Sequence, residues 1–232
     1  MARLPRLVIA GQLHLVMQRS HHAHPVFRCD EDFTRYLQFL REAAAASSVA
    51  VHAYALTPEQ AILLVTPNTS TSLGRLFQTL GKRFGADYNR RHGRTGALWE
   101  GRFRATVVEA ELHLLNCMRY VESAPVRLQL VESASEYPWS SAAHHIGRRT
   151  DGMIAEHPLY WRLGNTPFER EAVYTGLLNQ PLPLPLQEQM AGATEKGWLL
   201  ATPTFAEAMK AHTTRRLTPS PRGRPAKAVV GK

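Results

Sequence analysis

The sequence is poor in cysteine and lacks long apolar runs, and each shortage excludes a class of protein. Its two cysteines, Cys29 and Cys117, lie in different segments without zinc-site spacing, which excludes a disulfide framework and a zinc module. No apolar run approaches the roughly 20 residues that a membrane span needs. The apolar stretch at residues 7–10 is too short for the core of a signal peptide. We therefore expect a soluble, cytoplasmic protein with no membrane partner.

Acidic residues are missing from the C-terminal end. Residues 215–232 carry six basic side chains and no acidic one, which leaves +3 of the formal net charge of +9 for the rest of the chain. Such a concentration of cations attracts polyanions. The run from Arg222 through Gly223 and Arg224 to Pro225 resembles an AT-hook, whose arginines enter the narrow minor groove of A·T-rich DNA.

The hydrophobic periodicity predicts an α+β fold. Seven elements follow from it: strand 7–19, helix 30–47, strand 49–56, strand 60–66, helix 71–91, strand 102–108 and helix 111–123. This order predicts a ferredoxin-like split βαβ core, an antiparallel sheet with helices on one face.

The strand signal ends after residues 137–141. Residues 158–178 and 203–212 have helical patterns, and the proline-rich stretch 181–185 separates them. We expect a ferredoxin-fold domain at 1–147, a helical appendage at 148–214 and a disordered basic tail at 215–232.

Tyr120 is the side chain of greatest chemical interest. On a helical wheel, Leu114, Leu115, Met118 and Val121 cluster on one side and Tyr120 falls nearly opposite. The wheel therefore predicts that Tyr120 faces solvent or a ligand. An isolated tyrosine is more often a surface residue than a nucleophile.

Five blocks of the sequence resemble the REP-associated tyrosine transposases, a branch of the single-tyrosine His-hydrophobic-His (HUH) superfamily. The blocks are residues 11–27, 52–56, 89–102, 117–126 and 137–141. The resemblance implies DNA transposition, in which enzymes of this family cut and rejoin single-stranded DNA. It implies that Tyr120 attacks a backbone phosphorus and forms a 5′-phosphotyrosine link, while a divalent cation polarises the phosphate.

The metal ligands of that family are replaced. The resemblance places two strand histidines at Gln60 and Ile62, and an amide ligand at Ala124. Isoleucine and alanine cannot ligate a metal, and glutamine is a weak neutral ligand. Strand alternation predicts that Glu59 lies on the opposite face from Gln60. The sequence leaves open whether other histidines assemble a substitute site, namely His21, His22, His24 and His52.

Basic residues beside an aromatic predict a nucleic-acid surface. Phosphate contacts and base stacking need cations interleaved with rings, and Trp99 lies within such a segment, although a core position is an equal expectation for it. The predicted DNA-binding residues are Arg90, Arg91, Arg94, Arg102, Arg104, Arg222, Gly223, Arg224 and Pro225.

Three hypotheses follow. The first is a DNA-binding protein with a degenerate active site, which holds single-stranded or hairpin repeat DNA in the nucleoid and needs no cofactor. The alternative is an active tyrosine transposase that uses Tyr120 and a relocated Mg²⁺ or Mn²⁺ site. The third is a relic without a DNA role. Both a monomer and a homodimer are compatible with the sequence.

Overall fold

The structure, a computed structural model, describes residues 6–21 and 24–219. Four strands form one antiparallel sheet in the order β2-β3-β1-β4. They are β1 (Leu13–Arg19), β2 (Val49–Thr57), β3 (Gln60–Pro67) and β4 (Arg104–Val108). The β-α-β-β-α-β order of the predicted ferredoxin-like core is confirmed.

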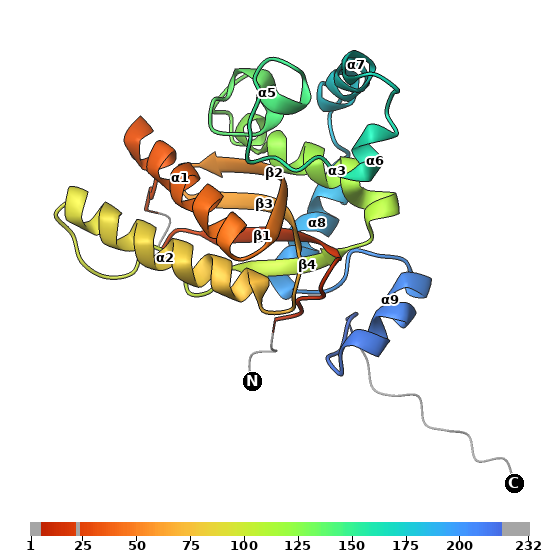
Figure 1. The fold of residues 1–232 in the computed structure, drawn as a ribbon, viewed down its shortest axis with the longest axis horizontal. Coiled ribbons are helices and arrows are strands. Elements are labelled where there is room, and N and C mark those ends of the chain that lie inside the picture. The colour runs from red at the N-terminus through yellow and green to blue at the C-terminus, as the bar shows by residue number, and fades with distance from the viewer. Residues whose placement is uncertain (1–5, 22–23, 220–232) are drawn as a thin grey trace, which may run out of the picture.

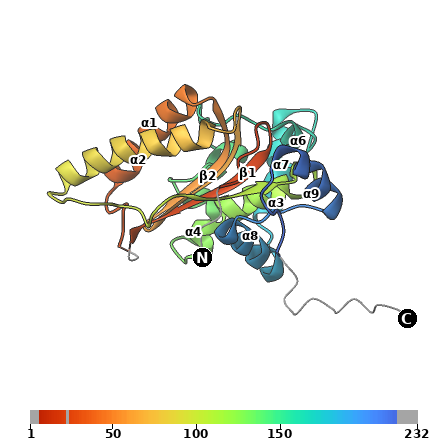
Figure 2. The same ribbon diagram turned by 90° about the horizontal axis from the view of Figure 1, so that it is seen from below.

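Two long helices, α1 (Asp30–Ala46) and α2 (Ser72–Arg91), cover one face of the sheet (Figure 2). Their apolar side chains pack on strand residues such as Val16, Tyr54 and Leu63, which are buried and point to this face. The spacing of three and four residues between apolar positions explains why each helix presents a continuous stripe to the sheet.

The opposite face of the sheet is also covered. Here α3 (Ala110–Glu122), α4 (Ala124–Arg127) and α8 (Leu184–Lys196) lie against the sheet (Figure 2). The expectation of helices on one face therefore holds for α1 and α2, and a second layer is added by α3 and the appendage. Burial on both faces explains why the β3 segment reads as a nearly continuous apolar run.

The first strand is shorter than the periodicity predicted. It begins at Leu13, after a turn in which Gly11 has φ 73°. Leu7 and Ile9 instead pack with Met209 and Leu217 in a separate apolar cluster. The apolar character of residues 7–10 thus reflects burial without a strand.

The regular elements of residues 148–214, the predicted appendage, are helices, but their breaks differ from the pattern. They are α6 (Pro158–Trp161), α7 (Pro167–Leu178), α8, α9 (Pro203–Met209) and η3 (Lys210–His212), while η2 (Ala134–Glu136) and α5 (Ala142–His145) precede this region. The predicted helix 158–178 is two helices, and α8 begins inside the proline-rich stretch 181–185. A proline is tolerated in the first turn of a helix because no intrahelical donor is needed there.

The start of the predicted tail belongs to the folded part. Leu217 is buried, its carbonyl accepts from the amide of Leu199, and Arg215 donates to the carbonyl of Gly197. Within the described ranges, no helix is both long and apolar enough to span a bilayer.

Candidate functional site

Tyr120 is buried, so of the two neighbours that the wheel predicted, solvent or a ligand, solvent is wrong. Its side chain is 6% exposed and belongs to the apolar cluster on the α3 side of the sheet. The wheel assumed one covering surface, whereas α3 contacts the sheet and also α4, α6 and α7. A residue opposite the main stripe of α3 therefore still meets protein.

Arg127 covers the ring of Tyr120. Its Cζ atom lies 4.2 Å from the ring centroid, and its guanidinium donates to Ser123 Oγ at 2.7 Å. Burial raises the pKa of Tyr120, and the charges of Arg127 and Arg19 oppose that rise without cancelling it. Since the tyrosinate is the stronger nucleophile, this environment leaves the hydroxyl poorly activated at neutral pH.

The three positions that the family resemblance assigns to metal ligands do not fit a divalent cation. Ile62 and Ala124 are each 1% exposed and share the apolar cluster of Tyr120. Gln60, half-buried at the start of β3, is the one residue of the three with a donor atom. A hard cation needs several oxygen or nitrogen ligands, and these positions supply one amide.

A cavity of about 370 Å³ opens beside this region, where β1 ends and β3 begins. Arg19, Glu59, Gln60 and Glu100 contribute its polar lining. The prediction that strand alternation puts Glu59 on the opposite face from Gln60 does not apply, because Glu59 lies in the turn before β3 and lines the same cavity as Gln60. Tyr120 does not line the cavity; Arg19, whose charge lowers the Tyr120 pKa, does.

Of the four histidines considered for a substitute metal site, the three that the structure describes do not come together. His52 is buried towards the start of β2, where Nδ1 lies 2.6 Å from the carbonyl oxygen of Ala155 and Nε2 lies 2.8 Å from Thr66 Oγ1. His21 and His24 line a different cavity, beyond the opposite end of the sheet. His22 lies outside the described residues.

One group of potential ligands does come together in the described part of the chain. Single atoms of Cys29, Asp32 and His92 lie within 4.8 Å of one another. The Asp32 carboxylate is already occupied, since Arg91 is 2.8 Å away and two backbone amides donate to it at the start of α1. This group lies on the α1 and α2 side, across the sheet from Tyr120. Because the Asp32 carboxylate is already bound, the group serves to cap α1 and does not suit a metal ion.

Two of the predicted DNA-binding arginines are engaged in the fold. The Arg91 side chain is 14% exposed and bridges Asp87 and Asp32. Arg104 pairs with Glu195 at 3.0 Å and with Glu100 at 3.8 Å. Their charges are neutralised locally, which removes most of their attraction for phosphate.

The remaining predicted arginines on the folded part are better placed to contact DNA phosphates. Arg90 pairs with Asp87 but is 76% exposed, and Arg94 is exposed with its Cζ 5.8 Å from the Tyr88 ring centroid. Arg102 is exposed and forms no ion pair with any described residue. The AT-hook-like residues, Arg222, Gly223, Arg224 and Pro225, lie outside the described residues.

Two site residues escaped the sequence reasoning. Arg19 faces the α3 side because it pairs in register with Gln60, and that pairing was the signal that could have found it. Arg127 lies seven residues after Tyr120, a spacing that returns to the same helical face when a second helix follows directly. Both bring positive charge to the tyrosine.

The fold matches those of known proteins, although the sequence does not. No protein-family model and no curated protein matches the sequence. Among solved structures, a REP-associated tyrosine transposase bound to a REP hairpin superposes with a TM-score of 0.55 at 14% identity, over 68% of this chain and 93% of that chain. A candidate transposase from Deinococcus radiodurans R1 gives a TM-score of 0.36 at 18% identity, over 50% and 93% of the two chains. The chain therefore has the fold of a REP-associated tyrosine transposase.

Proposed function

We propose that this protein is a transposase-like DNA-binding protein that holds single-stranded or hairpin repeat DNA and is impaired in metal-dependent cleavage. One observation carries the proposal: of the positions that the resemblance assigns to metal ligands, Gln60, Ile62 and Ala124, the last two are buried in the apolar cluster of Tyr120. A phosphotyrosine reaction needs charge neutralisation at the phosphate, and this lining does not offer a cation site.

DNA binding does not require that cation. Affinity for nucleic acid comes mainly from basic side chains that neutralise phosphates, and the chain carries a formal net charge of +9. Exposed Arg90, Arg94 and Arg102 on the folded part supply such contacts, together with the basic residues after position 219. The similar structure holds a REP hairpin, which makes a hairpin the first DNA to test.

The test is a pair of measurements on one hairpin-bearing single strand. Fluorescence anisotropy should show binding whose affinity falls as salt rises, with a slope that reports the number of phosphates neutralised. Incubation with Mg²⁺ or Mn²⁺ should yield no covalent protein–DNA adduct. An adduct that forms in the native protein and disappears in Tyr120→Phe would overturn the proposed impairment.

A second candidate, an active enzyme with a relocated metal site, is favoured by the cavity beside Arg19. Glu59, Gln60 and Glu100 bring oxygen atoms to its lining, the ligand type that Mg²⁺ prefers. This candidate predicts a metal-dependent adduct that is lost in Glu59→Gln as well as in Tyr120→Phe. Glu132→Gln is the control, because Glu132 is exposed and does not line this cavity.

The relic hypothesis makes a separate prediction. A protein without a DNA role would show weak affinity that does not depend on salt and does not fall when residues 215–232 are deleted. Strong salt dependence would exclude it.

A further inference from the structure

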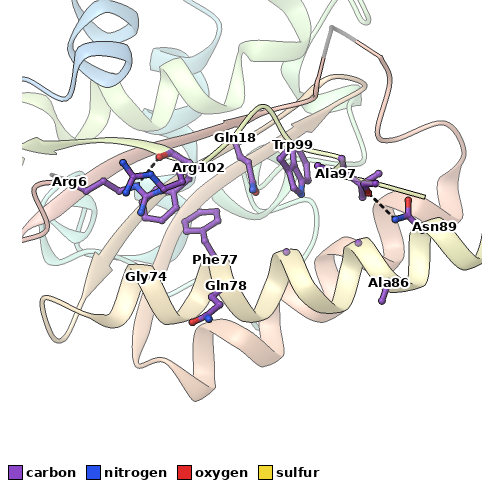
Figure 3. A pocket seen from close by; sticks show the side chains of 16 residues that line it. Arg6, Gln18, Gly74, Phe77, Gln78, Ala86, Asn89, Ala97, Trp99 and Arg102 are labelled. Carbon is purple, nitrogen blue, oxygen red and sulfur yellow. Dashed lines mark hydrogen bonds between the residues drawn. The ribbon is translucent and has the colours of Figure 1, made fainter. Parts of the chain in front are cut away.

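A second cavity, of about 530 Å³, lies on the α1 and α2 side of the sheet and so is separated from Tyr120 by the sheet itself. It runs between α2 and the segment 96–103 that precedes β4 (Figure 3). Its volume falls within the range of small-molecule sites in proteins. It shares Arg102 with the phosphate contacts of the proposed DNA-binding function, but neither Arg90 nor Arg94 lines it.

Three glycines make much of one wall of this cavity, which is a face of α2 that also carries Phe77, Gln78 and Asn89. Gly74, Gly81 and Gly85 lie on one side of α2, and a Cβ added to any of them would meet no atom within 4 Å. Phe77 of α2 stacks on Phe103 of the facing segment with centroids 4.3 Å apart, and Trp99 also lies on the facing segment, with Gln18 between it and these rings in Figure 3. A slot between the glycines of α2 and aromatic rings suits a planar ligand.

Two polar atoms in the slot lack partners. Gln18 is 7% exposed and its Oε1 accepts no hydrogen bond, while Trp99 is 8% exposed and its indole Nε1 has no acceptor. Figure 3 shows both side chains reaching from the sheet side towards α2. A buried polar group without a partner costs free energy, so an acceptor and a donor left open in one cavity point to a ligand that carries both.

The charged side chains that line the cavity are all positive. None of the described residues that line it is acidic, and exposed Arg102 forms no ion pair with any described residue. Arg6 adds a second guanidinium, 4.0 Å from the Phe103 ring centroid. The preferred ligand is therefore an anion joined to a planar ring with donors and acceptors on its edge.

We propose that this cavity binds one nucleotide, with the base in the slot against Gln18 and Trp99 and the phosphate at Arg102. Two sources have this chemistry: a free nucleotide, and an unpaired nucleotide within a DNA strand. The stacking of a base on aromatic side chains is independent of sequence, whereas contacts to its edge select among bases. The site is independent of Tyr120 and of any cleavage reaction.

The experiment follows the indole N–H resonance of Trp99 by NMR while each of the four deoxynucleoside 5′-monophosphates is added in turn. At least one should shift that resonance and leave the indole of Trp161 unmoved, because Trp161 lies in α6, outside the cavity. The matching nucleoside, which has no phosphate, should bind at least 10-fold more weakly. In Arg102→Gln the nucleotide and the nucleoside should bind equally.

Two matched variants separate the cavity from the surface. Gly81→Leu fills the slot and should weaken nucleotide binding at least 10-fold, while Thr79→Leu puts the same side chain on an exposed position of α2 outside the cavity and should change nothing. Gln18→Leu removes the unpartnered amide; it should weaken binding while leaving the fold at least as stable.

The source is identified by comparing the preferred monophosphate with an eight-nucleotide single strand that contains the same base. Equal affinity assigns the free nucleotide, and a strand that binds at least 10-fold tighter assigns a nucleotide within DNA. The proposal is overturned if the Trp99 resonance does not move at millimolar nucleotide, or if Gly81→Leu binds as the native protein does. The hairpin affinity of Gly81→Leu separates this site from DNA binding in general. Native hairpin affinity together with lost nucleotide binding would show that only the cavity is affected.

Discussion

At the scale of single residues, the decisive feature is that Tyr120 is enclosed. The family resemblance identified the tyrosine and its altered neighbours, but a wheel drawn for one helix did not include α4, which follows directly and places Arg127 over the ring. Glu59 escaped for a related reason, since strand parity applies only inside a strand and Glu59 lies in a turn. The apolar periodicity of a helix indicates the surface on which its main stripe packs, but not a second surface that covers its other side.

The altered positions predict what restoration would do. The triple variant Gln60→His, Ile62→His and Ala124→Asn should lose about 2–4 kcal/mol of stability without metal, because Ile62→His buries a polar ring in an apolar cluster. Calorimetry should show heat on adding Mn²⁺, and urea unfolding should show partial recovery of stability with Mn²⁺ bound.

The double variant that keeps Ile62 is the control for this restoration and should bind Mn²⁺ far more weakly. A triple variant that releases no heat would mean that the surrounding contacts can no longer orient the three ligands.

At the scale of elements, a buried carboxylate joins α3 to the appendage. Glu122 is fully buried and accepts hydrogen bonds from Ser141 and from Tyr174, while His145 Nδ1 lies 2.6 Å from its Oε1. These partners come from residues next to or within α5 and from α7, so one side chain holds three segments together. The sequence offered no periodic signal for it, because the contacts are long-range.

We expect Glu122→Gln to lower the free energy of unfolding by about 2–3 kcal/mol. The amide would turn a donor towards groups that are themselves donors, which leaves buried polar atoms without partners. Urea unfolding measures the loss. Glu132→Gln, at an exposed position, should unfold like the native protein, and equal stability of the two variants would contradict the role assigned to Glu122.

At the scale of the whole molecule, the arrangement of strands and core helices could be predicted and the second helical layer could not. The ferredoxin-like order follows from local apolar periodicity, which each element carries in its own sequence. The second layer depends on long-range packing between helices, which local periodicity does not report. In α8, moreover, the prolines begin a helix, whereas prolines usually indicate that one ends.

Stability of the whole chain should depend on pH through two buried histidines. Burial lowers the pKa of His14 and of His52 from 6.5 to about 4. The unfolded chain then binds more protons than the folded one between pH 6.5 and 4. The stability from these groups is therefore complete above pH 6.5 and falls below it, by roughly 1.4 kcal/mol per pH unit for each histidine.

Urea midpoints at pH 7.5 and pH 5 measure this effect. His14→Gln should flatten the dependence, since protonation of His14 would break the hydrogen bond that Nε2 accepts from the amide of Ile9. A variant whose midpoint falls with acid as steeply as that of the native protein would contradict this account.

The basic C-terminus makes the last prediction. Deleting residues 220–232 removes Arg222, Arg224, Lys227 and Lys232 but keeps Arg215 and Leu217, which pack on the fold. Hairpin affinity should fall, and the slope of log K against log salt should shrink by up to about 3–4 if all four cations contact phosphates. An unchanged slope would mean that DNA is held by the folded part alone.

Strand β1 ends with Gln18 in the cavity on one side of the sheet and Arg19 in the cavity on the other. Neighbouring residues thus serve two chambers, and the pleat keeps them apart. Substitutions at either position can alter one chamber without touching the other, so the two can diverge independently. Insertion or deletion of one residue in β1 would move each of these side chains to the opposite face of the sheet and so change both cavities at once. The residue types in this strand can therefore vary, whereas its length cannot.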